Sequence, residues 1–309
     1  MNSPGIIVIS MDLEKRWGVH DLYLDNFEIY KNNIFNIDKV VDKTLQMFDE
    51  YQIRATWAAV GALALDSWED YFNLIPNPAN YTNKKLIINR SYRQLKGSEN
   101  HFFGSHLLRN ILSAVGQDLG SHTFSHLYFQ EEGLTKDDFL NDSKMVEYIW
   151  KGKLKTQPPS SLVFPRNQVN YLESISDTSI RIYRSVEKGF YNNDNSTAAN
   201  NLISRAMRLV DSIYPYQKKA EKINVNNTRA SLFIRFNLPV LLWKMQLERI
   251  NYELDQLGEG EIFHIWWHPE NLGDDLIQSF NRLESIITII SGHLERGRVV
   301  SKNMADLLS

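Results

Sequence analysis

Short apolar runs alternate with amphipathic stretches along most of this chain. Residues 5–14 form a nearly continuous apolar run that ends in charge, which is typical of a strand covered on both faces. Asn36 could then cap a helix. The apolar positions of that helix recur at helical spacing, at Ile37, Val40, Val41, Leu45 and Phe48. Residues 53–63 resemble a second strand, and strand–helix–strand is the βαβ unit of a parallel sheet.

The same alternation continues to the end of the chain. Further strands are predicted within residues 117–126, 160–168, 180–187, 260–273 and 298–308. Further helices are predicted within residues 135–151, 202–213, 239–256 and 274–296, and a short one from residue 171. A Thr135–Asp138 capping box opens the helix within residues 135–151. Residues near 66–116 and 188–235 are too long for simple crossovers and are predicted as insertions. No fixed repeat or linker divides the chain, so residues 1–309 are predicted to form a single barrel-like α/β domain.

The composition of the chain excludes several kinds of partner and of catalytic site, and it says less about the fold. The formal charge of −3 gives no basic field, so a nucleic-acid partner is not expected. The absence of cysteine excludes thiolate catalysis and thiolate metal sites, which leaves His, Asp and Glu as metal ligands. The N-terminal run is too short to span a bilayer and lacks the features of a signal peptide. A cytoplasmic protein without a transmembrane segment is expected, and the oligomeric state stays open.

Four polar motifs fall at the ends of predicted strands, where parallel α/β folds build their sites. In the first, Asp12 and Glu14 are two residues apart and would share one face of an extended strand. They could serve as a general base and a metal ligand. Taken alone, an acidic pair after a strand more often caps a turn and pairs in solvent with a neighbour such as Lys15.

The second motif is LGSHTFSH, in which His122 and His126 are four residues apart. Imidazole is the commonest protein ligand of zinc. On a helical turn both rings would lie on one face and could reach one ion. This spacing is weakly specific, and two partly buried histidines bonded to the backbone explain it about as well.

The third motif, VFPRNQ, places Pro165 directly after an apolar strand. The proline restricts the residue before it and could direct the backbone N–H of Arg166 toward a site, with Asn167 beside it. The Arg166 side chain could pair with a carboxylate. A strand terminator followed by a surface arginine is the simpler explanation of this motif alone.

The fourth motif, FHIWWHPENLG, holds His264 and His268 on one face of a strand. A histidine at the end of such a strand is a candidate acid or base. Trp266 and Trp267 could stack on a sugar ring, although aromatic residues in strands usually belong to the core. One of the two is expected to face inward and the other toward the helices.

The order of these motifs along the chain resembles the polysaccharide deacetylase family, the NodB-homology domain of carbohydrate esterases. ATWAAVG at residues 55–61 is also similar to the second strand of that family. The resemblance covers residues 6–307 apart from the two insertions. It implies a distorted (β/α) barrel of about seven strands and a divalent metal, zinc or a similar ion, held by one carboxylate and two histidines.

The resemblance also implies a role for each matched residue. The metal ligands would be Glu14, His122 and His126. The catalytic residues would be Asp12 as general base, His268 as general acid and Arg166, whose N–H would help to bind the oxyanion. The substrate-binding candidates are Pro165, Asn167, Trp266 and Trp267.

Three differences from the family pattern leave parts of this assignment open. The acidic pair is spaced and ends in glutamate, so either Asp12 or Glu14 could hold the metal. The arginine that usually stands two residues before the motif-three proline is Val163 here, and Arg166 is the candidate replacement. No match to the fourth family motif is found, so the group that would tune His268 is unassigned.

The implied reaction is removal of an acetyl group, preferably N-acetyl, from a sugar or glycan precursor, such as an intermediate of surface-polysaccharide synthesis. Two alternatives remain. Related barrels hydrolyse other small amides and cyclic imides, and the chain could also be a non-catalytic carbohydrate-binding module on the same scaffold. Absence of Asp12 or His268 from the cavity would favour the binding module.

Overall fold

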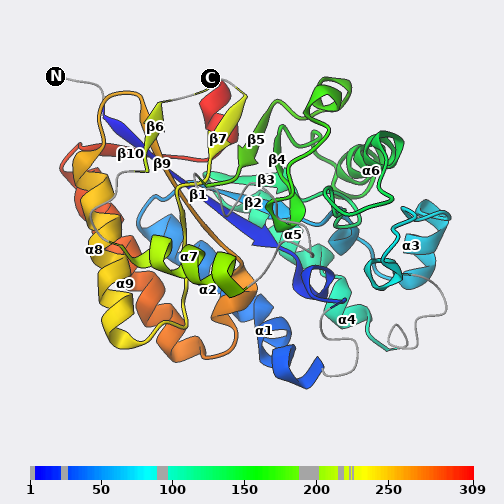
Figure 1. The fold of residues 1–309 in the computed structure, drawn as a ribbon, viewed down its shortest axis with the longest axis horizontal. Coiled ribbons are helices and arrows are strands. Elements are labelled where there is room, and N and C mark those ends of the chain that lie inside the picture. Colours follow the sequence, from blue (N-terminus) through cyan, green and yellow to red (C-terminus); the bar gives the residue numbers. More distant parts are fainter. Residues whose placement is uncertain are drawn as a thin grey trace.

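A computed structural model describes residues 4–21, 27–88, 97–187, 202–214, 219–222, 224 and 226–309. Parts of the two predicted insertions, residues 89–96 and 188–201 among them, lie outside the described residues. The fold is mixed α/β (Figure 1). It is built on a nearly closed barrel of eight strands. This architecture confirms the predicted distorted (β/α) barrel.

The barrel closes through a bent segment near residue 230. The barrel strands are β1 (Gly5–Leu13), β2 (Ala55–Ala59), β3 (Gln117–Ser121), β4 (Ser161–Val163), β5 (Ile182–Ser185), β7 (Asn227–Arg229), β8 (Leu232–Phe233) and β9 (Glu261–Trp267). Parallel pairing runs from β9 through β1, β2, β3, β4 and β5 to β7, and β8 pairs back to β9. Between β7 and β8, Ala230 N–H donates to Ser185 O of β5 and Ser231 N–H donates to His264 O of β9. Since β7 and β8 share one position in the ring, the eight strands fill seven positions.

Two short strands lie outside this ring. β10 (Val299–Lys302) pairs in parallel with the first half of β1, whose second half pairs with β2. β6 (Glu221–Lys222) pairs antiparallel with the start of β9. The site described below lies at the other end of the strands.

Helices cover the outer face of the barrel (Figure 1). The described helices are α1 (Lys31–Phe35), α2 (Ile37–Glu50), α3 (Trp68–Leu74), α4 (Glu99–Phe102), α5 (Ser105–Ser113), α6 (Lys136–Ile149), α7 (Leu202–Ile213), α8 (Val240–Gln256) and α9 (Leu276–Glu295). α8 packs against both α7 and α9. Among the described helices, none combines the length and apolarity that a membrane span requires.

Side chains of β1 alternate between the helices and the barrel interior. Ile6 and Val8 point inward and join a small buried cluster with residues of β2, β4, β5 and β9. Ser10 and Asp12 follow on the same side, nearer the carboxyl end, and both contact Arg184 across the barrel. The interior therefore has an apolar floor and a polar upper layer.

The predicted insertion at 66–116 packs over the turn that follows β1. Trp17 is fully buried, and its indole N–H donates to Phe102 O at 2.8 Å. The Lys15 ammonium group is also buried and donates to Asn100 O and Phe103 O, each at 2.6 Å. Two side chains of the β1 turn are thus bonded to the backbone of the insertion.

The two predicted helix starts have different outcomes. Thr135 and Asp138 form the predicted capping box at the start of α6. Asn36 occupies the N-cap position of α2 as predicted, but its side chain makes no capping hydrogen bond. Its amide donates instead to Gly273 O at 2.9 Å, which fastens the start of α2 to the turn after β9.

Candidate active site

The polar motifs meet at the carboxyl end of the barrel. Asp12 lies in β1 and Glu14 just beyond it, while His122 follows β3 and His268 follows β9. A cavity of about 560 Å³ opens here, within the range of small-molecule sites. Among the predicted site residues, those that line it are Asp12, Glu14, Arg166, Asn167, Trp266 and His268.

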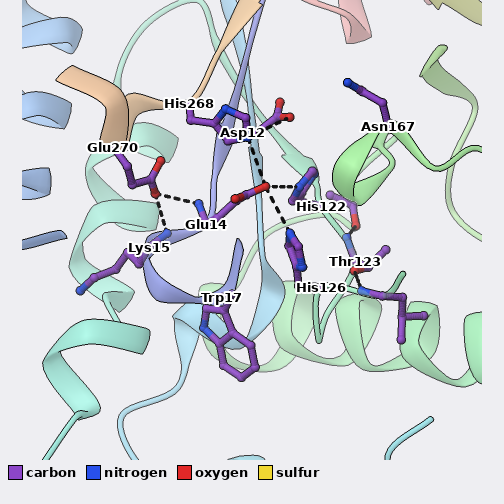
Figure 2. A network of polar contacts seen from close by, with 12 residues as sticks. Asp12, Glu14, Lys15, Trp17, His122, Thr123, His126, Asn167, His268 and Glu270 are labelled. Atoms are coloured by element: carbon purple, nitrogen blue, oxygen red, sulfur yellow. Dashed lines mark hydrogen bonds and ion pairs between the residues drawn. The ribbon is translucent and has the colours of Figure 1, made fainter. Parts of the chain in front are cut away.

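Glu14 lies at the centre of this group, as Figure 2 shows. Its Oε1 atom is 2.8 Å from Nε2 of His122 and 3.2 Å from Nε2 of His126. The Nε2 atom of His268 approaches the same oxygen at 3.5 Å. Burial alone would raise the pKa of Glu14, but the charges of His268 and His126 and the hydrogen bonds from His122 and His126 hold it well below its usual value.

This arrangement fits a divalent metal. One ligand atom from each of Glu14, His122 and His126 lies within 4.8 Å of the others, and all three residues are buried. Burial lowers the pKa of His126, which favours the neutral imidazole that a metal requires. A carboxylate with two imidazoles is a donor set typical of zinc and similar ions. Of the two acidic residues, Glu14 is thus the one beside both histidines.

The two histidines are brought together by a loop, not by a helical turn. The expectation of a helical turn is wrong, because Thr123 and His126 have left-handed φ values of 62° and 56°. The loop is held from α6: the Asp142 carboxylate accepts the N–H groups of Phe124 and Ser125 at 2.6 and 2.9 Å. The ring centroids of His122 and His126 are consequently 5.3 Å apart.

Gly18 lies against the Glu14 carboxylate, which leaves no room for a side chain at this position. A β-carbon at Gly18 would lie 1.7 Å from Oε2 of Glu14. We expect Gly18→Ala to displace this carboxylate from His122 and His126 and to weaken divalent-metal binding by about tenfold or more. Metal titration of the metal-free protein measures the effect. Gly152→Ala is the control, because a β-carbon there meets nothing within 4 Å; equal affinities for the two variants would contradict the prediction.

Asp12 is paired with an arginine that the sequence analysis missed. Arg184 of β5 is buried and donates from both terminal nitrogens to the two carboxylate oxygens of Asp12, each at 2.7 Å. The same guanidinium group donates to Ser10 Oγ and Asn167 Oδ1 and lies 4.1 Å over the Trp266 ring. Its fork geometry fixes the orientation of the Asp12 carboxylate.

Arg184→Met is expected to lower the free energy of unfolding by about 3–5 kcal/mol, because Asp12 would remain as a buried charge without its partner. Denaturant unfolding measures the change. The double variant Asp12→Leu with Arg184→Met should recover part of the loss, since no unpaired charge remains. A single variant as stable as the native protein would show that the pair contributes little.

His268 is electrostatically coupled to both acidic residues. Its Nε2 atom lies 3.9 Å from Asp12 Oδ2, in addition to its approach to Glu14. Burial would lower the pKa of His268, but the carboxylates of Glu14 and Asp12 outweigh this and raise it to about 9. The imidazole is therefore protonated at neutral pH and can donate a proton.

Motif three lies at the cavity, and its arginine pairs with a carboxylate, as the sequence suggested. Pro165 opens a short turn in which Arg166 and Asn167 both have a left-handed φ of 54°. The partner of the Arg166 guanidinium group is the Asp21 carboxylate, at 2.6 Å, while Asp12 pairs with Arg184. Pro165 itself is buried and is not among the cavity-lining residues, so it acts on the site through the two residues that follow it.

The two tryptophans of β9 face opposite sides, as strand alternation predicts. Trp266 lines the cavity and its indole N–H donates to Glu187 at 2.9 Å. Trp267 is buried in the main core beside Phe236 and is not a lining residue, so it is not placed to contact a substrate in this cavity. The reason is geometric, because neighbouring strand residues cannot both face the barrel interior.

The fold is similar to that of solved structures. The chain is similar to a protein assigned as a polysaccharide deacetylase from Mycobacterium smegmatis, with a TM-score of 0.55, 11% identity, and coverage of 100% of this chain and 90% of that one. It is also similar to one from Pseudomonas aeruginosa PAO1, with a TM-score of 0.56, 9% identity, and coverage of 98% and 89%. No protein-family description and no curated protein matches the sequence. The chain therefore has the NodB-like polysaccharide deacetylase fold, and its reaction must be argued from the site.

Proposed function

We propose that this chain is a metal-dependent deacetylase that hydrolyses an acetyl group, preferably N-acetyl, from a sugar or glycan precursor. One observation carries the proposal. The buried Glu14–His122–His126 group lies in direct contact with His268, and Asp12, Glu14 and His268 share one cavity. A metal site beside a positioned acid and a positioned base is an arrangement that can hydrolyse an amide at neutral pH.

Glu14, His122 and His126 would hold the ion. When bound, a divalent ion would act as a Lewis acid toward the acetyl carbonyl and the attacking water. Asp12, fixed by Arg184, would accept a proton from that water. His268, which lies 3.9 Å from Asp12 and 3.5 Å from Glu14, would donate its proton to the departing amine. The products would be acetate and the free amino sugar.

Other cavity residues would orient the substrate. Trp266 presents an aromatic ring to the cavity, with Phe233 at a centroid distance of 4.5 Å, and such rings can pack against the apolar face of a sugar. Asn167 lines the cavity and is bonded to Arg184. The N–H of Arg166 remains the candidate donor for the oxyanion, a contact worth about 3–4 kcal/mol in other hydrolases.

The non-catalytic alternative is less well supported. A binding module would not need Asp12 and His268 at the cavity, yet both line it. Asp12 is also held by a buried bidentate arginine, which a sugar platform would not require. Hydrolysis of another small amide or a cyclic imide uses the same groups and stays the alternative reaction.

Acetate release from the metal-loaded protein tests the proposal. The substrates would be N-acetylated and O-acetylated sugars, with a cyclic imide assayed in parallel by ring opening. We expect acetate from at least one N-acetyl sugar. Ring opening without acetate release would support the alternative reaction, and a metal-loaded protein inert toward all three classes would overturn catalysis. Glycan-precursor synthesis and a cytoplasmic location remain predictions from the sequence.

A further inference from the structure

A buried carboxylate in the turn after β9 accepts hydrogen bonds from the backbone that carries Glu14. Glu270 is 1% exposed, and its Oε1 atom accepts the N–H of Glu14 at 2.9 Å and the N–H of Lys15. Figure 2 shows both contacts. One oxygen atom therefore binds two consecutive backbone donors at the point where β1 ends.

Glu270 is itself fixed from the opposite side. The side-chain amide of Asn33 donates to Glu270 O at 2.8 Å. The turn lies so close to α1 that a β-carbon at Gly273 would be 2.8 Å from both Cα and O of Asn33. Glu270 therefore has little freedom to move away from Glu14.

From these contacts we propose that Glu270 is a positioning residue that holds Glu14 in place to bind the metal. The inference rests on the proposed metal site but not on the substrate. Glu270 follows His268 by two residues, so the same short turn fixes the acid histidine and, through the backbone, the carboxylate ligand. Groups that orient metal ligands typically contribute about 10–100-fold to metal affinity.

A second buried carboxylate provides a matched control. Glu253 is fully buried and accepts the N–H groups of two consecutive residues, Lys219 at 2.7 Å and Ala220 at 3.4 Å. It therefore does for another segment what Glu270 does for the β1 turn. Glu253→Leu should destabilise the fold in a comparable way without reaching the metal site.

The test is zinc titration of the metal-free protein with thermal unfolding measured in parallel. We expect Glu270→Leu to weaken zinc binding about 10–100-fold. Glu270→Gln, whose amide oxygen can still accept both N–H groups, should stay within about threefold of the native protein. Glu253→Leu should leave zinc affinity unchanged while lowering the unfolding temperature.

Glu270→Asp keeps the charge but withdraws the acceptor, and it replaces Glu270→Leu if that variant does not fold. Weaker zinc binding by this variant would support positioning. Unchanged affinity in Glu270→Leu or Glu270→Asp, or an equal loss in Glu253→Leu, would overturn the inference. So would an equal loss in Glu270→Gln and Glu270→Leu. A native protein that binds zinc but releases no acetate would refute the proposed reaction and leave this inference standing.

Discussion

His122→Ala is expected to remove the bound metal. His122 is completely buried and contributes one of the two imidazole nitrogens beside Glu14 Oε1. Changes in residues that merely orient ligands cost about 10–100-fold in affinity, so loss of a ligand should cost more than about 100-fold. Elemental analysis after dialysis should find about one zinc-like ion per native chain and almost none in the variant, together with loss of acetate release.

His20→Ala is the matched control for this experiment. His20 is also a buried histidine, but its Nδ1 atom contacts Trp17 O at 2.9 Å, and it does not belong to the grouped candidate ligands among the described residues. The control should keep its metal. A full equivalent of metal in His122→Ala would exclude His122 as a ligand, and a native protein that cannot be loaded would remove the metal from the mechanism.

Asp12→Asn should separate catalysis from metal binding. If Asp12 is the general base, the amide cannot accept the proton, and kcat should fall by about 10²–10⁴-fold. Metal content should persist, because Glu14 lies beside both histidines. The measurement is steady-state acetate release on a substrate found in the screen, with metal content determined on the same samples.

Glu14→Gln is the comparison variant, and it should lose the metal. This pair of variants settles which acidic residue is the ligand, since Asp12, Glu14 and His268 form a second potential ligand group. Loss of metal in Asp12→Asn with retention in Glu14→Gln would reverse the two roles. Thermal unfolding should accompany both assays, because Asp12→Asn also leaves the Arg184 charge without its carboxylate.

The tendency of parallel α/β folds to build their sites at the carboxyl ends of strands explains how much of the site could be predicted. The pair Asp12 and Glu14 is far in the sequence from His122 and from His268, but each of these residues follows or ends a parallel strand, and such strands all finish at one edge. Placing these residues together needed no long-range information. Choosing between Asp12 and Glu14 did need it, because only the loop after β3 determines which carboxylate the histidines reach.

Arg184 is a site residue that the positions of strand ends could not predict. It lies inside a strand, and its partner in β1 is 172 residues away. One signal was available: Ile180, Ile182 and Arg184 share a strand face, and a charged residue on an otherwise apolar face needs a buried partner. The sequence could not say which carboxylate that partner would be.

The contacts between the insertion near 66–116 and the turn after β1 limit which changes in the insertion the site can accept. None of the described cavity-lining residues comes from 97–104, yet Lys15 and Trp17, just past Glu14, are bonded to its backbone carbonyl groups. Backbone acceptors do not depend on side-chain identity, so substitution of the exposed Asn100 should be tolerated, whereas Phe102 and Phe103 are buried in the core and should not be replaceable in this way. Changes in length would shift those carbonyl groups and with them the turn that carries Glu14. The length of this segment is therefore more constrained than the identity of the side chains at its exposed positions.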